Sequence, residues 1–184
     1  MQAAILNRLL AVTDVVDRAT EWLGQWLKWL VLGSSMVSAF NALMRYTINY
    51  SSNAWLEIQW YMFGAMFLLG AGYALKHEEH VRVDVFFSQM TPRQQAWLDV
   101  FGGIFFLMPM ATIIAWMSIP MVVNSINIWE HSSDPGGLLR WPIKIAIPLG
   151  FVLLAIQGVA EIIKKYAVAT GARAPGKVYE RPVQ

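Results

Sequence analysis

The string HEEHVRVDV at residues 77–85 holds the densest set of acid–base and metal-ligating side chains in the sequence. His77 and His80 stand three positions apart, whereas the helical zinc-protease motif needs two histidines four positions apart so that both reach one ion. The string therefore does not predict a zinc protease. A metal site made of His77, Glu78, Glu79 and His80 stays open as an alternative, but we favour a solvated polar loop.

Other common chemistries lack their residues. The sequence has no cysteine, which excludes disulfides, thiolate metal sites and cysteine nucleophiles. A membrane cytochrome would need axial haem ligands such as histidine inside its helices, and no histidine falls in a long apolar stretch, since His131 lies in a polar turn region. We therefore predict that the protein is not an enzyme and binds no metal, cofactor or nucleic acid.

Two ionisable residues, Arg45 and Glu57, lie within apolar stretches, where a charge needs a partner or a short route to water. If the turn between their helices centres near Ser51, each lies six residues from it, and an antiparallel hairpin brings them to a similar depth. The sequence leaves two interpretations open: an ion pair, or two side chains that separately reach the membrane surface.

Small residues four positions apart recur on three apolar stretches: Ser34, Ser38 and Ala42; Gly70 and Ala74; Ala146 and Gly150. Such patterns allow a second helix to approach closely, so we expect the first set, with Asn41 and Arg45 beside it, to face protein and not lipid. Gln157 and Glu161 stand near the end of the fourth stretch, where we expect a solvated helix end.

Composition predicts the elements that position these residues. The 184 residues are 57% hydrophobic and include nine tryptophans and nine phenylalanines, more than a soluble core of this size needs. A helix needs about 20 apolar residues to cross a bilayer core. We therefore predict an all-α integral membrane protein, a single membrane domain over residues 1–184, with spans at 26–48, 55–75, 96–119 and 141–163. Trp60 and its neighbour Trp55 are expected to anchor the second span at the membrane surface.

An amphipathic helix is predicted before the first span, over residues 3–21. Its apolar residues recur at helical spacing while most charged residues fall elsewhere, which is typical of a helix lying on the membrane surface. A cleavable signal peptide is the alternative, but that leader would be overlong and acidic.

Helix boundaries follow from capping and turn residues. The string Thr91-Pro92-Arg93-Gln94 has the residues of a capping box, so the third helix is expected to begin near Pro92. Pro109 and Pro148 predict kinks. The residues at 132–137 predict a turn, and Pro142 predicts that a helix restarts there.

The basic residues predict the orientation. With both termini in the cytoplasm, the inner side holds Arg8, Arg18, Lys76, Arg82, Arg93, Lys164, Lys165, Arg173, Lys177 and Arg181, against Arg45, Arg140 and Lys144 outside. Because basic residues concentrate on the cytoplasmic side, we expect both termini there, with residues 166–184 as a cytoplasmic tail.

Two strings carry a family resemblance: NAWLEIQWYMFGAMFLLGAGYALKHEEHVRVDVFF and DPGGLLRWPIKIAIPLGFVLLAIQGVAEIIKK. With the four spans and the amphipathic start, the chain from about Trp22 to Lys165 resembles the small (DctQ-type) membrane subunit of tripartite ATP-independent periplasmic (TRAP) transporters. The resemblance implies a bacterial inner-membrane location and two partners, a large multi-span transport subunit and a periplasmic substrate-binding protein. It also implies import driven by an ion gradient, usually of sodium, with the substrate and ion sites on the large subunit, which the small subunit braces.

Within these strings we expect a set of residues to contact partners or to fix the fold: Glu57, His80, Arg82, Asp84, Asp134, Pro135, Gly136, Gly137, Arg140, Trp141 and Lys144. By the predicted orientation, His80, Arg82 and Asp84 lie in a cytoplasmic loop and order it or dock the large subunit. The turn around Gly136 and Arg140 lies on the periplasmic side, where the binding protein arrives.

The residues themselves favour a brace over a transport pathway, because the chain shows no repeated halves, discontinuous helices or acidic cluster at mid-membrane. The resemblance suggests a small organic acid as the transported substrate, by analogy alone. A membrane anchor for a soluble enzyme, such as a quinone-linked one, is the alternative function, and a free-standing exporter comes third.

Overall fold

The computed structural model describes residues 2–77 and 90–174, and its regular elements there are helices. They are α1 (Gln2–Ile48), α2 (Asn53–Lys76), α4 (Pro92–Gly102), the π-helical segment η1 (Gly103–Leu107), α5 (Met108–Asn127) and α6 (Trp141–Ala169). Because α4, η1 and α5 are continuous, four long helical rods result, each long and apolar enough to cross a membrane. The predicted all-α class with four spans is confirmed.

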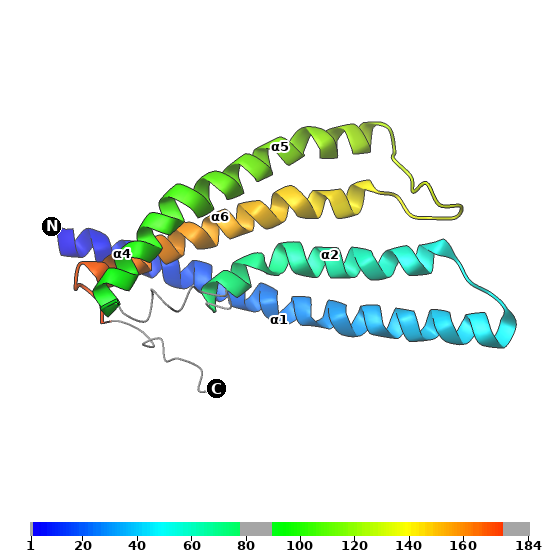
Figure 1. Ribbon diagram of the computed structural model, residues 1–184, viewed down its shortest axis with the longest axis horizontal. Helices are drawn as coiled ribbons and strands as arrows, with labels where there is room; N and C mark the ends of the chain where they lie inside the picture. Colours follow the sequence, from blue (N-terminus) through cyan, green and yellow to red (C-terminus); the bar gives the residue numbers. More distant parts are fainter. Residues whose placement is uncertain (1, 78–89, 175–184) are drawn as a thin grey trace.

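Helices α1 and α2 run antiparallel, as do α5 and α6, whereas α2 and α6 run in the same direction (Figure 1). Helix α2 packs between α1 and α6, and α5 packs on α6; α4 and the first part of α1 also contact α6. The N-terminus, α4 and the end of α6 lie at one end of the molecule, called here the N-terminal end. The connections 49–52 and 128–140 lie at the opposite end, called the loop end. Helix α6 is therefore the element that joins the others.

Helix α1 runs without a break from Gln2 to Ile48. The stretch 3–21, expected as a separate amphipathic helix, is helical but continuous with the first span, and its location on the membrane surface stays a prediction. The helix ends where Asn49 takes a positive φ of 54°, a left-handed conformation that asparagine tolerates better than most residues. Ser52 then caps α2 by accepting a hydrogen bond from the Ala54 amide. The hairpin turn therefore falls where the sequence predicted it.

The start and the bend of the third rod agree with the prediction from the sequence, whereas its end does not. Thr91 and Gln94 form the expected capping box, with Pro92 at the start of α4. Ahead of Pro109, the Met108 amide donates to the Gly103 carbonyl, five residues back, so the helix relaxes into a π turn. Figure 1 shows α4 and α5 as one curved rod. The rod continues to Asn127, beyond the predicted end at 119.

The expected kink at Pro148 does not interrupt α6, which is helical from Trp141 to Ala169 and so extends four residues into the predicted tail. Residues 175–184 of that tail lie outside the described part of the chain.

Helices α2 and α6 meet at closely approaching backbones. A Cβ added at Gly150 would lie 2.5 Å from the Leu68 carbonyl oxygen, closer than any real contact. Gly150, expected in a helix-packing pair with Ala146, therefore does lie in such a contact. Gly70 behaves differently, because its added Cβ would meet only Leu27 of α1, at an ordinary 3.8 Å.

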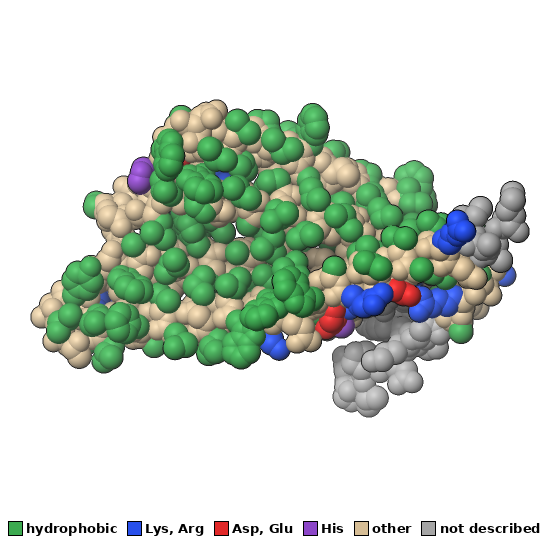
Figure 2. All heavy atoms as spheres, turned by 180° about the vertical axis from the view of Figure 1, so that it is seen from behind, with side chains coloured by type: hydrophobic (Ala, Val, Ile, Leu, Met, Phe, Trp, Pro, Cys, Tyr) green, Lys and Arg blue, Asp and Glu red, His purple; other side chains and the backbone are tan. Residues whose placement is uncertain are grey.

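Apolar side chains cover most of the exterior. Figure 2 shows one face on which hydrophobic groups dominate and most visible charges gather toward the N-terminal end. Trp22, Trp26 and Trp29 of α1 are each more than half exposed. A surface of this kind suits contact with lipid or with another membrane protein and agrees with four helices that are able to span a membrane.

The α2–α6 contact predicts that Gly150→Ala destabilises the fold by about 1–3 kcal/mol, because the new methyl group meets backbone atoms that cannot move aside. Gly102→Ala is the matched control, since nothing lies within 4 Å of its added Cβ, and it should be neutral or stabilising by up to about 1 kcal/mol. Thermal unfolding of both variants in detergent tests this. Equal midpoints for the two variants would contradict the packing argument.

Candidate functional site

The connection between α5 and α6, residues 128–140, folds back on itself at the loop end. Asp134, Pro135, Gly136 and Gly137 form a type II turn: the Gly137 amide donates to the Asp134 carbonyl at 3.0 Å, and Gly136 has a φ of +72°. The residues that flank the turn are also joined, since the Ser132 amide donates to the Leu138 carbonyl at 2.9 Å. The turn predicted from residues 132–137 is confirmed.

Glu57 of α2 holds this loop in place through hydrogen bonds. Its side chain is only 3% exposed, and its carboxylate accepts hydrogen bonds from the Ser132 hydroxyl and, at 2.6 Å, from the Leu138 amide. A Cβ added at Gly137 would lie 2.9 Å from Glu57 Oε1 and 2.5 Å from Ser132 Cβ. Gly137 is thus required for the loop to close over the carboxylate.

Arg140 completes the arrangement around Glu57. Its guanidinium donates to the Ser132 hydroxyl at 3.0 Å, lies 3.7 Å from the Glu57 carboxylate, and packs 5.2 Å from the ring centre of Trp60. We name Glu57, Ser132, Leu138 and Arg140 the loop clamp. With one buried carboxylate and one guanidinium, the clamp balances its own charges.

Further contacts fasten the loop to both helices beside it. Asn53 donates to the Pro135 carbonyl at 2.9 Å, and the Tyr61 hydroxyl donates to the Leu139 carbonyl at 2.7 Å. Lys144 of α6 pairs with Glu130, and the hydrogen bond from that ammonium lowers the pKa of the Glu130 carboxyl. Trp141 begins α6. The loop is therefore held by α2 and α6 together.

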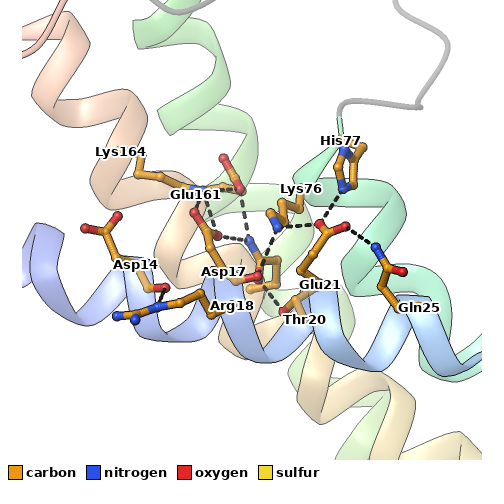
Figure 3. Close-up of polar contacts among 11 residues, drawn as sticks. Asp14, Asp17, Arg18, Thr20, Glu21, Gln25, Lys76, His77, Glu161 and Lys164 are labelled. Atoms are coloured by element: carbon orange, nitrogen blue, oxygen red, sulfur yellow. Dashed lines mark hydrogen bonds and ion pairs between the residues drawn. The ribbon is translucent and has the colours of Figure 1, made fainter.

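A second polar site lies at the N-terminal end and joins α1, α2 and α6 (Figure 3). We call it the polar network; its members are Asp17, Thr20, Glu21, Lys76, His77, Gln157, Glu161 and Lys164. Gln157 lies at its centre, fully buried. Its amide donates to Asp17 at 2.8 Å and to Glu161 at 3.0 Å, and its carbonyl oxygen accepts from the Thr20 hydroxyl at 2.7 Å. The expected solvated helix end is wrong for Gln157, because α1 covers it.

Lysines balance the carboxylates of the polar network. Lys164 contacts both oxygens of Asp17, at 2.9 and 2.8 Å, and Glu161 at 2.6 Å. On the other side of α1, Glu21 accepts from Lys76 at 2.6 Å and lies 2.9 Å from His77. Figure 3 shows these side chains converging between the helices. The carboxylates of α1 therefore connect the helix to α2 and α6 and do not simply face solvent.

Arg45 and Glu57 are not paired. Glu57 takes its partners from the loop, whereas Arg45 is exposed and lies 5.1 Å from the ring of the adjacent Tyr46. Of the two interpretations that the sequence left open, the ion pair is therefore wrong in this structure. His80, Arg82 and Asp84 lie outside the described residues, as do Glu78 and Glu79.

The residues of the predicted small-residue stripe of α1 differ in exposure, although Ser34, Ser38 and Ala42 line one shared groove. Ser34 and Asn41 are buried within this chain, Ser34 donating to the Gln59 carbonyl at 3.4 Å. Ser38 is exposed, and it lies in a groove of about 500 Å³ between α1 and α2 that Ala39, Ala42 and Phe63 also line. We call this the hairpin groove. Ala74, on α2, is half-buried and does not line it.

Neither polar site has the make-up of a catalytic or metal centre. In the described part of the chain, no group of three His, Cys, Asp or Glu residues is placed to hold a metal ion. The carboxylates of both sites are occupied by amides, hydroxyls and cations of the same chain. This arrangement defines a class, a helix-packing membrane protein whose polar groups fix its own architecture.

Comparison with known families agrees with the assignment to a class of membrane proteins. Residues 34–167 match the family described as tripartite ATP-independent periplasmic transporters, DctQ component. The chain belongs to that family and is therefore a small permease component of a TRAP transporter and not an enzyme. Systems of this type also contain a large membrane subunit and a binding protein. None of the curated proteins compared with the sequence matches it.

The polar network was missed at the sequence level, although a signal was present. Asp17 and Glu21 stand four positions apart on α1, as do Gln157 and Glu161 on α6, with Lys164 one turn further. Polar residues of opposite charge at matching helical spacing could have predicted a contact between these two helices.

The centre of the network predicts that Gln157→Leu costs about 2–4 kcal/mol of unfolding free energy, although leucine has a similar volume. The substitution leaves Thr20, Asp17 and Glu161 without their shared partner in a buried place. Gln25→Leu is the control, because Gln25 is exposed and its hydrogen bonds, to Glu21 at 3.4 Å and from Lys28 at 3.2 Å, lie at the surface. Denaturation in detergent measures both. A loss for Gln25→Leu as large as that for Gln157→Leu would show that burial is not the cause.

The loop clamp predicts that Glu57→Ala loosens residues 128–140 and lowers stability by about 2–4 kcal/mol, since two donors and a cation lose a buried acceptor. Limited proteolysis, with cleavage sites identified by mass spectrometry, should show faster cutting within this loop. Asp134→Ala removes an exposed carboxylate from the same loop and should leave its cleavage rate unchanged. Unaltered cleavage in Glu57→Ala would refute the clamp.

Proposed function

We propose that this subunit braces the large transport subunit in the bacterial inner membrane, with both termini in the cytoplasm, during binding-protein-dependent import of a small organic acid. An ion gradient, with sodium as the expected ion, drives the import. The substrate and ion sites belong to the large subunit. Family membership supports the permease role, and the distribution of basic residues supports the orientation.

The observation that carries the bracing role is the hairpin groove. It is lined mainly by small side chains of α1, and no residue of α5 or α6 lines it. Small residues on a membrane-facing surface allow close backbone approach, which is the main source of helix association where the hydrophobic effect is absent. A transmembrane helix of the large subunit fits this groove.

The loop end is the surface we assign to the binding protein. Arg140 is engaged by Glu57, Ser132 and Trp60, so its role there is to set the shape of the loop. The exposed backbone of the type II turn, shaped by Pro135 and Gly136, is the part that a docked protein would contact.

The test is a mild-detergent pull-down of the chain, tagged after Gln184, from its native membrane. We expect a large multi-span protein to copurify with wild type, and Ser38→Leu to reduce its recovery at least about tenfold by filling the groove. Thr112→Leu is the matched control, an exposed hydroxyl residue of α5 outside the groove. Unfolding midpoints check that both variants fold.

Two outcomes would overturn the proposal. Full recovery of the partner with Ser38→Leu would show that the interface lies on another face of the protein. Recovery of the chain with a soluble oxidoreductase instead would favour the alternative role of a membrane anchor.

A further inference from the structure

A second groove, of about 650 Å³, opens at the N-terminal end between the start of α1, α4 with η1, and the end of α6. Its walls are largely aliphatic and include Leu9, Val100, Ile104 and Ile162. None of the polar network side chains lines it. We call it the terminal groove, and neither the packing of the helices nor the proposed function explains it.

The terminal groove follows the last turns of α6. Ile162 lies at its apolar part, about two turns before the helix ends, and Thr170, Gly171 and Ala172 lie just after the helix end. At 1.5 Å per helical residue, the distance from Ile162 to Thr170 is about 12 Å, close to the thickness of one leaflet of the hydrocarbon core. Tyr166 lines the groove between these levels and is partly exposed, as is usual for aromatic residues at a membrane surface.

Arginines stand beside the part of the groove where α6 ends. Arg93 of α4 donates from Nε to the Ala169 carbonyl at 2.7 Å, which fixes its guanidinium next to Thr170 and leaves its terminal nitrogens for another acceptor. The Arg173 amide donates to the Ala167 carbonyl at 3.1 Å, and its side chain is exposed. Both arginines therefore lie within a few residues of the groove lining.

The described carboxylates near the groove do not pair with Arg93 or Arg173. Asp17 and Glu161 pair with Lys164, and Asp99 pairs with Lys165 at 3.2 Å. Among the described residues, no carboxylate lies within ion-pair distance of Arg93 or Arg173. An apolar channel that ends beside two guanidinium groups without a carboxylate partner in the described part of the chain complements an acyl chain attached to an anionic phosphate.

We propose that the terminal groove binds an anionic phospholipid, with an acyl chain along Leu9, Ile104 and Ile162 and the headgroup phosphate at Arg93 and Arg173. The bound lipid fills the space between α1, α4 and α6 and so links the N-terminal helix to the rest of the bundle. This binding is a property of the single chain and does not depend on the assembly with a large subunit.

Native mass spectrometry of the purified full chain tests the proposal after delipidation, by adding back phosphatidylglycerol or phosphatidylcholine with identical acyl chains. We expect phosphatidylglycerol to bind at least about tenfold more tightly, since each arginine near the membrane surface contributes roughly fivefold. Arg93→Gln with Arg173→Gln should remove that preference. Arg173→Gln alone should remove part of it, and it breaks no hydrogen bond of the fold.

Matched controls separate the groove from general charge and hydrophobicity. Arg18→Gln with Arg45→Gln lowers the net charge equally, away from the groove, and should keep the preference. Leu9→Trp, which fills the groove, should weaken the binding of both lipids, whereas Val12→Trp, on the same helix but outside the lining, should not. Inorganic phosphate should not compete at concentrations equal to those of the lipid.

Equal binding of the two lipids by the wild type would overturn the proposal. So would loss of the preference in the Arg18 and Arg45 double variant, because the effect would then follow net charge. An unchanged affinity in Leu9→Trp would place the bound lipid elsewhere.

Discussion

The hydrocarbon core of a membrane offers no hydrogen-bond partner, so every polar group placed there must find one within the protein. Both ends of this molecule obey that constraint in the same way. At the loop end the carboxylate of Glu57 gathers donors from a loop that begins about 70 residues later in the sequence. At the N-terminal end Gln157 gathers three side chains from α1 and its own helix. The loop clamp thus fixes the start of α6 to α2, and the polar network fixes its other end to α1, which pairs in turn with α2.

Between these sites, packing replaces polar contact. The Gly150 backbone meets the Leu68 carbonyl region, so α2 and α6 cannot slide or rotate past each other without a clash. Since lipid tails are as apolar as the side chains, hydrophobic burial does little to hold membrane helices together. Polar contacts at the ends and a close backbone contact in the middle therefore carry much of the specificity. Such a rigid unit is what a bracing role requires.

The sequence predicted the parts of the fold that depend on local rules. The capping box at Thr91, the turn within residues 132–137 and the four apolar rods all follow from residues near one another. The partners of Glu57 and Gln157 could not be predicted in this way. They depend on which face of each helix is turned toward its neighbour. The antiparallel register that suggested an Arg45–Glu57 pair predicts how deep each residue lies in the membrane, but not the rotation of each helix about its own axis.

The continuity of α1 changes how the amphipathic start should be understood. A helix that lies on the membrane surface needs its charged face in water, yet Asp17 and Glu21 face α6 and α2 and are matched there by Lys164 and Lys76. The same stretch of α1 therefore has two different faces, an apolar one toward lipid and a polar one toward the bundle. Because the polar contacts are part-buried and charge-assisted, separating this stretch from the bundle would cost several hydrogen bonds at once. The polar face of the first helix is therefore bound to the bundle, while the location of this stretch on the membrane surface stays a prediction.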